Sequence, residues 1–327
     1  MGLNGYVVLG SAVVGLLVGL TGAGGGALMT PMLILLFKVT PSSAISSDLV
    51  AAVLMRPFGA AVHLRKGTVN LRLVGWMTLG SVPMAFLGAY LLHLLGNGAA
   101  DQLNVERALG AALLVGSAAM VFRWFLDRRS AIQRSQTVRQ VTIRPLPTVL
   151  IGMAGGLIVG MTSVGSGSLM IVLLLFAYPL IGASQLVGTD LAQAVPLTAA
   201  AALGALAFGH VEFGVTASIV IGSVPAVLAG SLLSSRAPDR YIRPVITFVI
   251  LASGLKYAGI GTTALAWTLA GVVAAAGAYA IARTRPWRRA RPPDAAPADA
   301  PAEPADNLPV SLDRGQRRRR AHLQWSA

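Results

Sequence analysis

Long apolar stretches separated by short polar segments run along most of this chain. Most of them are close to the roughly 20 residues that an α-helix needs to cross a bilayer. The first and the fifth are longer, and each is interrupted midway by glycine and hydroxyl residues. The nine stretches cover residues 5–37, 43–64, 71–95, 104–125, 148–178, 184–208, 213–235, 241–258 and 263–282.

Composition places these stretches in a membrane. Hydrophobic residues make up 55% of the 327 residues and charged residues only 12%, about half the charged share of a soluble domain. Unbroken apolar runs favour helices over the alternating strands of a membrane barrel. We therefore predict an all-α polytopic membrane protein.

The two halves of the chain repeat one another. The register is an offset of 141 residues, as from Gly24 to Gly165, and becomes 142 before Asp48, which matches Asp190. One register held over this length indicates duplication rather than chance similarity between apolar helices. The other matches pair Thr21 with Thr162, Gly26 with Gly167, and the tetrapeptide at 80–83 with that at 222–225.

Basic residues predict the topology, because Lys and Arg collect in cytoplasmic loops. Four basic segments, around Arg65, Arg134, Arg240 and Arg285, fall on one side only if both interrupted stretches return to the side they enter from. Each repeat then has a re-entrant or broken hairpin and three crossings, so the second repeat is inverted. The alternative, in which both interrupted stretches cross the bilayer, stays open.

The predicted organisation ends on the cytoplasmic side of a bacterial cell membrane. The tail is rich in Pro, Ala and Asp, which is typical of disorder, and its arginine run from Arg317 suits anionic lipids better than nucleic acid. The parts are a first repeat (1–127), a basic cytoplasmic linker (128–147), a second repeat (148–260), an additional C-terminal helix (261–283) and a disordered cytoplasmic tail (284–327).

The interruptions are candidate anion sites. A helix that begins in a glycine-rich break offers unpaired backbone amides and the positive end of its dipole to an anion. The alternative is that the glycines only let helices pack closely in lipid, but two copies at matched positions favour a site. The candidate substrate-binding residues in the two breaks are Thr21, Gly22, Gly24, Gly25, Gly26, Thr162, Ser163, Gly165, Ser166 and Gly167.

Three charged residues complete the candidate site. Arg56 lies well inside an apolar stretch, where it is either an anion ligand or an arginine that reaches to the membrane edge. Asp48 and Asp190 are candidates for ion coupling, because a carboxylate in a membrane is costly and is usually functional. The alternative for both is an N-terminal helix cap.

The motifs resemble one known family. TGAGGGALMTPML, SSDL and HLRKGTVNLRLVGWMTLGSVP, followed by TSVGSGSLM and VGTDLAQAVPL, are together similar to the TauE/SafE sulfite exporter family over about residues 5–260. The resemblance implies a permease for small sulfur-containing or carboxylate anions, driven by an ion gradient. Similar sequences often have lysine at position 56 and GTD where this chain has Ser46, Ser47 and Asp48.

The functional prediction is a secondary active transporter of a small inorganic or organic anion, coupled to protons or another ion. A passive anion channel of the same fold is the alternative, and an enzyme is a remote one, because no catalytic constellation is visible. We expect no cofactor and no metal site, since the chain has no cysteine and only four histidines. Monomer and homodimer both stay open.

Overall fold

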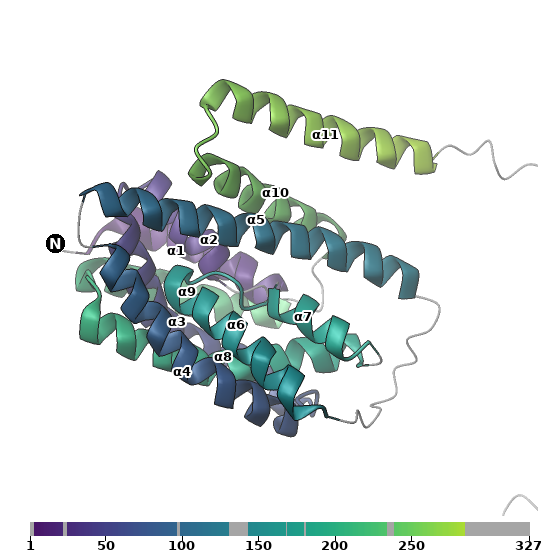
Figure 1. Ribbon diagram of the computed structural model, residues 1–327. Helices are drawn as coiled ribbons and strands as arrows, with labels where there is room; N and C mark the ends of the chain where they lie inside the picture. The colour runs from purple at the N-terminus through teal and green to yellow at the C-terminus, as the bar shows by residue number, and fades with distance from the viewer. Residues whose placement is uncertain are drawn as a thin grey trace, which may run out of the picture. The chain divides into compact units, whose positions relative to one another are not determined.

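The protein folds into α-helices. The computed structural model describes residues 3–21, 25–96, 99–130, 143–167, 169–179, 181–233 and 239–284, and within these ranges it contains helices and no strands (Figure 1). The predicted all-helical membrane protein is thereby confirmed. The eleven helices of the described part are α1 Gly5–Thr21, α2 Gly26–Leu35, α3 Pro41–Arg65, α4 Leu71–Leu95, α5 Ala99–Ser130, α6 Pro145–Thr162, α7 Leu169–Ala177, α8 Ala183–Phe208, α9 Phe213–Leu233, α10 Asp239–Tyr257 and α11 Thr262–Thr284.

Helix ends lie where local chemistry favours them. Pro41 and Pro145 stand in the first turns of α3 and α6, where a missing N–H costs nothing. Asn70 caps α4 by accepting a hydrogen bond from the Leu73 amide at 3.2 Å. Both interrupted stretches are broken into two helices, as predicted.

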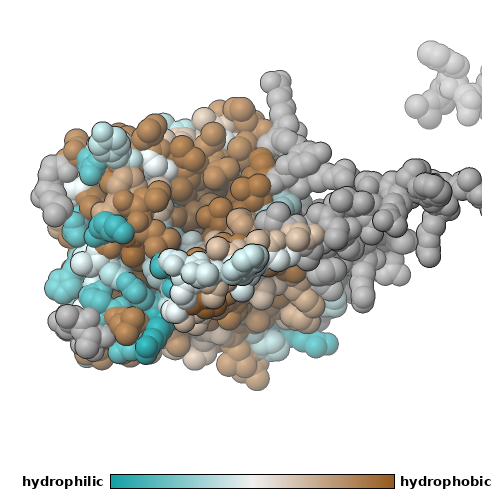
Figure 2. All heavy atoms as spheres, turned by 90° about the horizontal axis from the view of Figure 1, so that it is seen from above, coloured by the Kyte–Doolittle hydropathy of each residue, from teal (hydrophilic) through white to brown (hydrophobic). Residues whose placement is uncertain are grey.

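Six described helices are long and apolar enough to cross a membrane: Pro41–Arg65, Leu71–Leu95, Gln102–Arg123, Pro145–Thr162, Ser184–Phe208 and Phe213–Leu233. Their outward faces carry large apolar side chains, for example Leu79 at 62% exposure and Leu232 at 78%. Brown, hydrophobic residues accordingly cover much of the face in Figure 2. Such a surface suits lipid, since soluble monomers rarely expose large apolar patches.

The chain reverses direction at each break. A Cβ atom on Gly10, near the start of α1, would lie 2.8 Å from the Met32 sulfur near the end of α2. In the second hairpin, the Tyr178 hydroxyl after α7 donates to the Arg144 carbonyl before α6 at 3.1 Å. The two ends of each hairpin therefore lie together, and the chain does not continue straight on at either break.

Two interfaces pack in the same way. Helix α1 runs parallel to α9, and α4 runs parallel to α6, with glycines where the backbones approach most closely. At each of these glycines an added Cβ would overlap the facing backbone, as in other small-residue contacts between membrane helices. The approaches form four pairs at the sequence offset of the repeat: Gly15 on Ser223 and Gly156 on Ser81, Gly19 on Val227 and Gly160 on Ala85, Gly222 on Val8 and Gly80 on Val149, Gly230 on Leu16 and Gly88 on Leu157.

Hydrogen bonds follow the same pairing. The Asn70 amide donates to Thr189 Oγ1 at 3.1 Å, and the Glu212 amide donates to Ser47 Oγ at 3.1 Å. Each bond ties the start of one helix, α4 or α9, to the residue before an aspartate in the opposite half. Equivalent positions of the two halves thus meet equivalent partners in the other half.

The returning arms of both hairpins lie inside the protein. Met29 and Leu33 of α2 are fully buried in an apolar cluster that also contains Leu109 and Leu113 of α5. The residues matched to them by the repeat in α7, Met170 and Leu174, are fully buried in a second apolar cluster. Irregular backbone at the breaks is tolerated in such surroundings because it faces protein rather than lipid.

The chain divides into two units, Met1–Gly271 and Val272–Ala327. The first unit holds both hairpins and helices α3 to α10, and within it α5 packs along α10 (Figure 1). The predicted linker at 128–147 and tail at 284–327 fall mostly outside the described residues.

Candidate functional site

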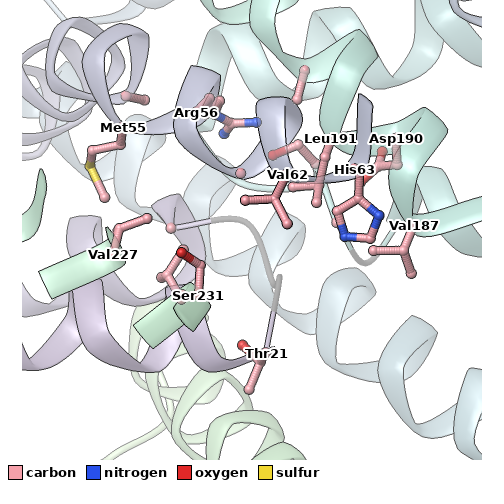
Figure 3. Close-up of a pocket in the computed structure, with 18 of the residues that line it drawn as sticks. Thr21, Met55, Arg56, Val62, His63, Val187, Asp190, Leu191, Val227 and Ser231 are labelled. Carbon is pink, nitrogen blue, oxygen red and sulfur yellow. The ribbon is translucent and has the colours of Figure 1, made fainter. Parts of the chain in front are cut away.

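A cavity of about 230 Å³ lies between the two hairpins and is lined by α1, α3, α8 and α9. In Figure 3, Arg56, His63 and Asp190 border it from α3 and α8, and Thr21, Val227 and Ser231 border it from α1 and α9. The structure brings eight of the predicted site residues to its wall: Thr21, Gly25, Gly26, Asp48, Arg56, Ser166, Gly167 and Asp190.

The other predicted residues are placed differently. Gly22 and Gly24 lie outside the described residues. Thr162 ends α6, Ser163 and Gly165 follow it in the second break, and none of the three lines the cavity. The Thr162 hydroxyl is used within its helix, since it donates to the Ile158 carbonyl at 2.6 Å.

The two breaks touch each other. A Cβ atom on Gly26, the first residue of α2, would overlap the backbone carbonyl of Ser163, the residue after α6. Ser163 has a left-handed backbone with φ 57°, and Gly165 follows with φ 121°, a conformation that side chains other than glycine rarely adopt. Gly26 therefore allows the close approach between the breaks, and Gly165 allows the sharp turn after α6.

Asp48 is held by hydroxyl groups from both hairpins. Its Oδ2 accepts from Thr30 Oγ1 at 3.0 Å and from Ser163 Oγ at 2.7 Å. Its side chain is 1% exposed. The carboxylate thus joins α3 to the arm α2 and to the break after α6.

The capping alternative for the two aspartates is wrong. Helix α3 begins at Pro41 with Thr40 as its N-cap, and α8 begins at Ala183 with Gly182 as its N-cap. Asp48 and Asp190 therefore lie in helix interiors. The polar run before Asp48 suggested a later start, but its serines are buried inside α3.

Asp190 has fewer partners than Asp48. It accepts a hydrogen bond from the Gly167 amide, while its buried Oδ1 has no hydrogen-bond partner among the residues that the structure describes. Ser166, beside Gly167, likewise has a buried hydroxyl without a described partner. Both groups border the cavity.

Arg56 brings positive charge to this wall. Its charge interacts with both Asp48 and Asp190. Its Nη2 atom is buried and has no hydrogen-bond partner within the described part of the chain. A guanidinium nitrogen that is unpaired and removed from water is costly, so a ligand with acceptor oxygens would stabilise it.

Sequence reasoning missed two residues of the wall. Lys66, directly after α3, and His63 were not among the predicted site residues, but both border the cavity. His63 Nδ1 lies 3.0 Å from Thr68 Oγ1. The cavity therefore reaches the end of the bundle where the basic segment around Arg65 lies. Only the proximity of Lys66 to Arg56 along one helix could have indicated this.

Among the described residues, no group of three or more His, Cys, Asp or Glu could hold a metal ion. The donors at the cavity are amides, hydroxyls and a guanidinium, which suit acceptor oxygens. A polar cavity between two broken hairpins, enclosed by apolar membrane helices, is the architecture of a membrane transport protein.

Comparison with known proteins gives the family. The profile of the family described as sulfite exporter TauE/SafE matches residues 7–257. The chain is 41% identical over 251 residues to the probable membrane transporter protein YjnA of Bacillus subtilis, covering 76% of this chain and 98% of the relative. It is 24% identical, with the same coverage, to the probable membrane transporter protein YdhB of that organism. No solved structure matches the chain.

The chain therefore belongs to the sulfite exporter TauE/SafE family. It is a multi-pass membrane transporter, not an enzyme. The resemblance expected from the glycine-rich breaks and the matched aspartates is confirmed, and the family match covers residues 7–257.

Proposed function

We propose that the protein is a secondary active permease for a small anion, namely sulfite, an organosulfonate or a related sulfur-containing or carboxylate anion. One observation carries the proposal: Arg56 lines a cavity between the two breaks, and its buried Nη2 has no hydrogen-bond partner among the described residues. The family description names sulfite, whose oxygens would accept hydrogen bonds from this group.

The cavity matches the size and donors of such a ligand. Its volume of about 230 Å³ corresponds to several waters at about 30 Å³ each, enough for a small oxyanion and part of its hydration shell. Arg56 supplies the charge, Ser166 a hydroxyl, and Gly25, Gly26 and Gly167 the backbone of the breaks. Gly22 and Gly24 of the first break, and Thr162, Ser163 and Gly165 of the second, belong to the proposed site as sequence candidates.

The same proposal includes the inverted repeat. The matched glycine contacts of α1 with α9 and of α4 with α6 support two repeats, 1–127 and 148–260. In an inverted repeat the two copies are related by a two-fold axis in the membrane plane. Residues 128–147 are then a cytoplasmic linker, 261–283 an additional helix, and 284–327 a cytoplasmic tail in a bacterial cell membrane. The basic loops and tail contact anionic lipids.

Packing at the matched positions supports alternating access over a channel. On the side of the cavity, α3 contributes the lining residues Arg56, Gly59 and His63. The positions in α8 that the repeat matches to them are Thr198, Ala201 and Ala205. Those three residues are at most 1% exposed, so the equivalent path toward the opposite end is packed shut. One side open and its counterpart closed is what a transporter requires at any moment.

The experiment is flux in proteoliposomes that contain the purified protein. Labelled sulfite, thiosulfate, sulfonates and carboxylates are offered with and without a pH gradient. We expect one of these anions to exchange rapidly and to accumulate when the gradient is applied. Conduction without any coupling would instead show a channel, and no flux of any anion would contradict the proposed substrate class.

The orientation has a separate test, since the chain contains no cysteine. Single cysteines replace Arg134 in the central linker and Arg317 in the tail, and an impermeant thiol reagent is applied to intact cells and to inverted vesicles. Both positions should react only in inverted vesicles. Labelling from opposite faces would contradict the inverted repeat.

A further inference from the structure

The two matched aspartates differ in their surroundings. Asp48 receives hydrogen bonds from Thr30 and Ser163. At the positions that the repeat matches to these two hydroxyl residues, the sequence has Ile171 and Gly22. Neither replacement has a side-chain donor, and Ile171 is packed in the apolar core. The duplication has therefore kept both carboxylates but only one set of hydroxyl donors.

This difference separates the two groups chemically. A buried carboxylate that accepts two hydroxyl hydrogen bonds is stabilised as an anion. Asp190 has the Gly167 amide on one side, and its other oxygen is buried without a described partner. Such an oxygen loses hydration without replacement, and a bound proton removes the charge that causes this cost.

Charged residues around the cavity also favour proton binding at Asp190. Arg56 on α3 interacts with both aspartates, and Arg123 on α5 also interacts with Asp190. His63 on α3 lies further toward the mouth together with Lys66. When an anion occupies Arg56, that residue can no longer compensate Asp190 fully. Binding of the anion therefore favours simultaneous uptake of one positive charge at Asp190.

We propose that Asp190 binds the proton that is transported together with the anion, and that Asp48 is a structural brace between the hairpins. This inference rests on the proposed function. The carboxylate gains one O–H bond from a solvent proton on the side to which the cavity opens, and loses that proton on the other side. A proton fits better than a metal cation, because the Gly167 amide and Arg56 present N–H donors rather than the oxygen ligands that hard cations require.

The first experiment needs no substrate. Difference infrared spectra of the purified protein in liposomes are recorded as the pH is lowered, in H₂O and D₂O, to detect the C=O stretch of a protonated carboxyl. The wild type and Asp48→Asn should show a titrating carboxyl band, which Asp190→Asn should lack. Retention of the whole band in Asp190→Asn, or its loss in Asp48→Asn, would overturn the assignment.

The second experiment measures coupling with labelled sulfite. Asp190→Asn should retain sulfite exchange at equal pH on both sides but lose the stimulation of uptake by a pH gradient. Asp48→Asn should keep the ratio of driven to undriven uptake, and its unfolding temperature should fall because the brace is weakened. Loss of exchange in folded Asp190→Asn would make Asp190 a substrate ligand and overturn the inference.

The two failures can be told apart. If the wild type does not exchange sulfite, the substrate proposal fails, while the infrared titration still decides whether Asp190 takes up a proton. If the wild type exchanges sulfite and Asp190→Asn still responds fully to the gradient, the proton carrier is another group and the proposed permease function remains.

Discussion

Arg56→Gln tests the anion site most sharply, because glutamine keeps a polar, uncharged side chain while it removes the charge and the guanidinium. In the wild type Arg56 lines the cavity, and its buried Nη2 atom has no described hydrogen-bond partner. We expect the variant to bind and transport the anion weakly, since the remaining amide is a neutral donor.

The size of the effect follows from the bond that is lost. A hydrogen bond to a charged group contributes about 1.5 to 3 kcal/mol. A loss of about 2 kcal/mol corresponds to a rise of roughly 30-fold in the apparent substrate constant. Arg56→Lys should fall between the two proteins, because the charge remains while the planar guanidinium fork is lost.

The assay is counterflow exchange of the anion that the flux panel identifies, measured at equal pH on both sides over a range of concentrations. Arg72→Gln is the matched control, because it removes one charge at an exposed position of α4 outside the cavity wall. This control should change the constant by no more than about twofold. Size-exclusion profiles and unfolding temperatures show that each variant is folded.

A normal substrate constant in Arg56→Gln would show that Arg56 does not bind the anion. Arg56 would then serve only to compensate Asp48 and Asp190, with which its charge interacts, and the anion would bind elsewhere. An equal loss in Arg56→Gln and Arg72→Gln would show that the effect comes from the overall charge of the protein.

Two further predictions concern packing and access. Gly26→Ala should lower the free energy of unfolding by about 1 to 3 kcal/mol, because its Cβ would overlap the facing backbone. The control Gly75→Ala should be neutral or stabilising, because a Cβ atom at position 75 has open space around it and alanine favours helix. Unchanged stability of Gly26→Ala would contradict the contact between the breaks. In a labelling assay, Gly59→Cys should react with an impermeant thiol reagent from the side of the basic loops, and Ala201→Cys only from the opposite side and only during transport. Equal reaction of both from one side would contradict alternating access.

Much of the fold was predictable from the sequence, because apolar length and glycine punctuation are local signals. The breaks after Thr21 and Thr162 fall where the glycine and serine clusters indicated them. The direction of the chain after each break was indicated only indirectly, by the basic loops, since an interrupted apolar stretch has the same hydropathy whether it continues or returns. Only contacts such as that of Gly10 with Met32 decide it.

The candidate site was predictable in its members but not in their roles. Matching the halves brought Asp48 and Asp190 together as equivalents, and both border the cavity. Their difference depends on Thr30 and Ser163, which lie far away in sequence and donate to Asp48 alone. The local sequence around an aspartate does not show which distant residues donate hydrogen bonds to it. The sequence therefore predicted the same role for Asp48 and Asp190.

In the proposed transport mechanism, a small anion binds beside Arg56 between the two breaks. Selenite, the selenium analogue of sulfite, can locate that anion directly through anomalous X-ray scattering from crystals of the unlabelled protein soaked with it. We predict a selenium peak inside the cavity, within hydrogen-bond distance of Arg56 Nη2, that disappears in Arg56→Gln. A peak outside the cavity, or an empty cavity in crystals of a protein that exchanges selenite, would contradict the account.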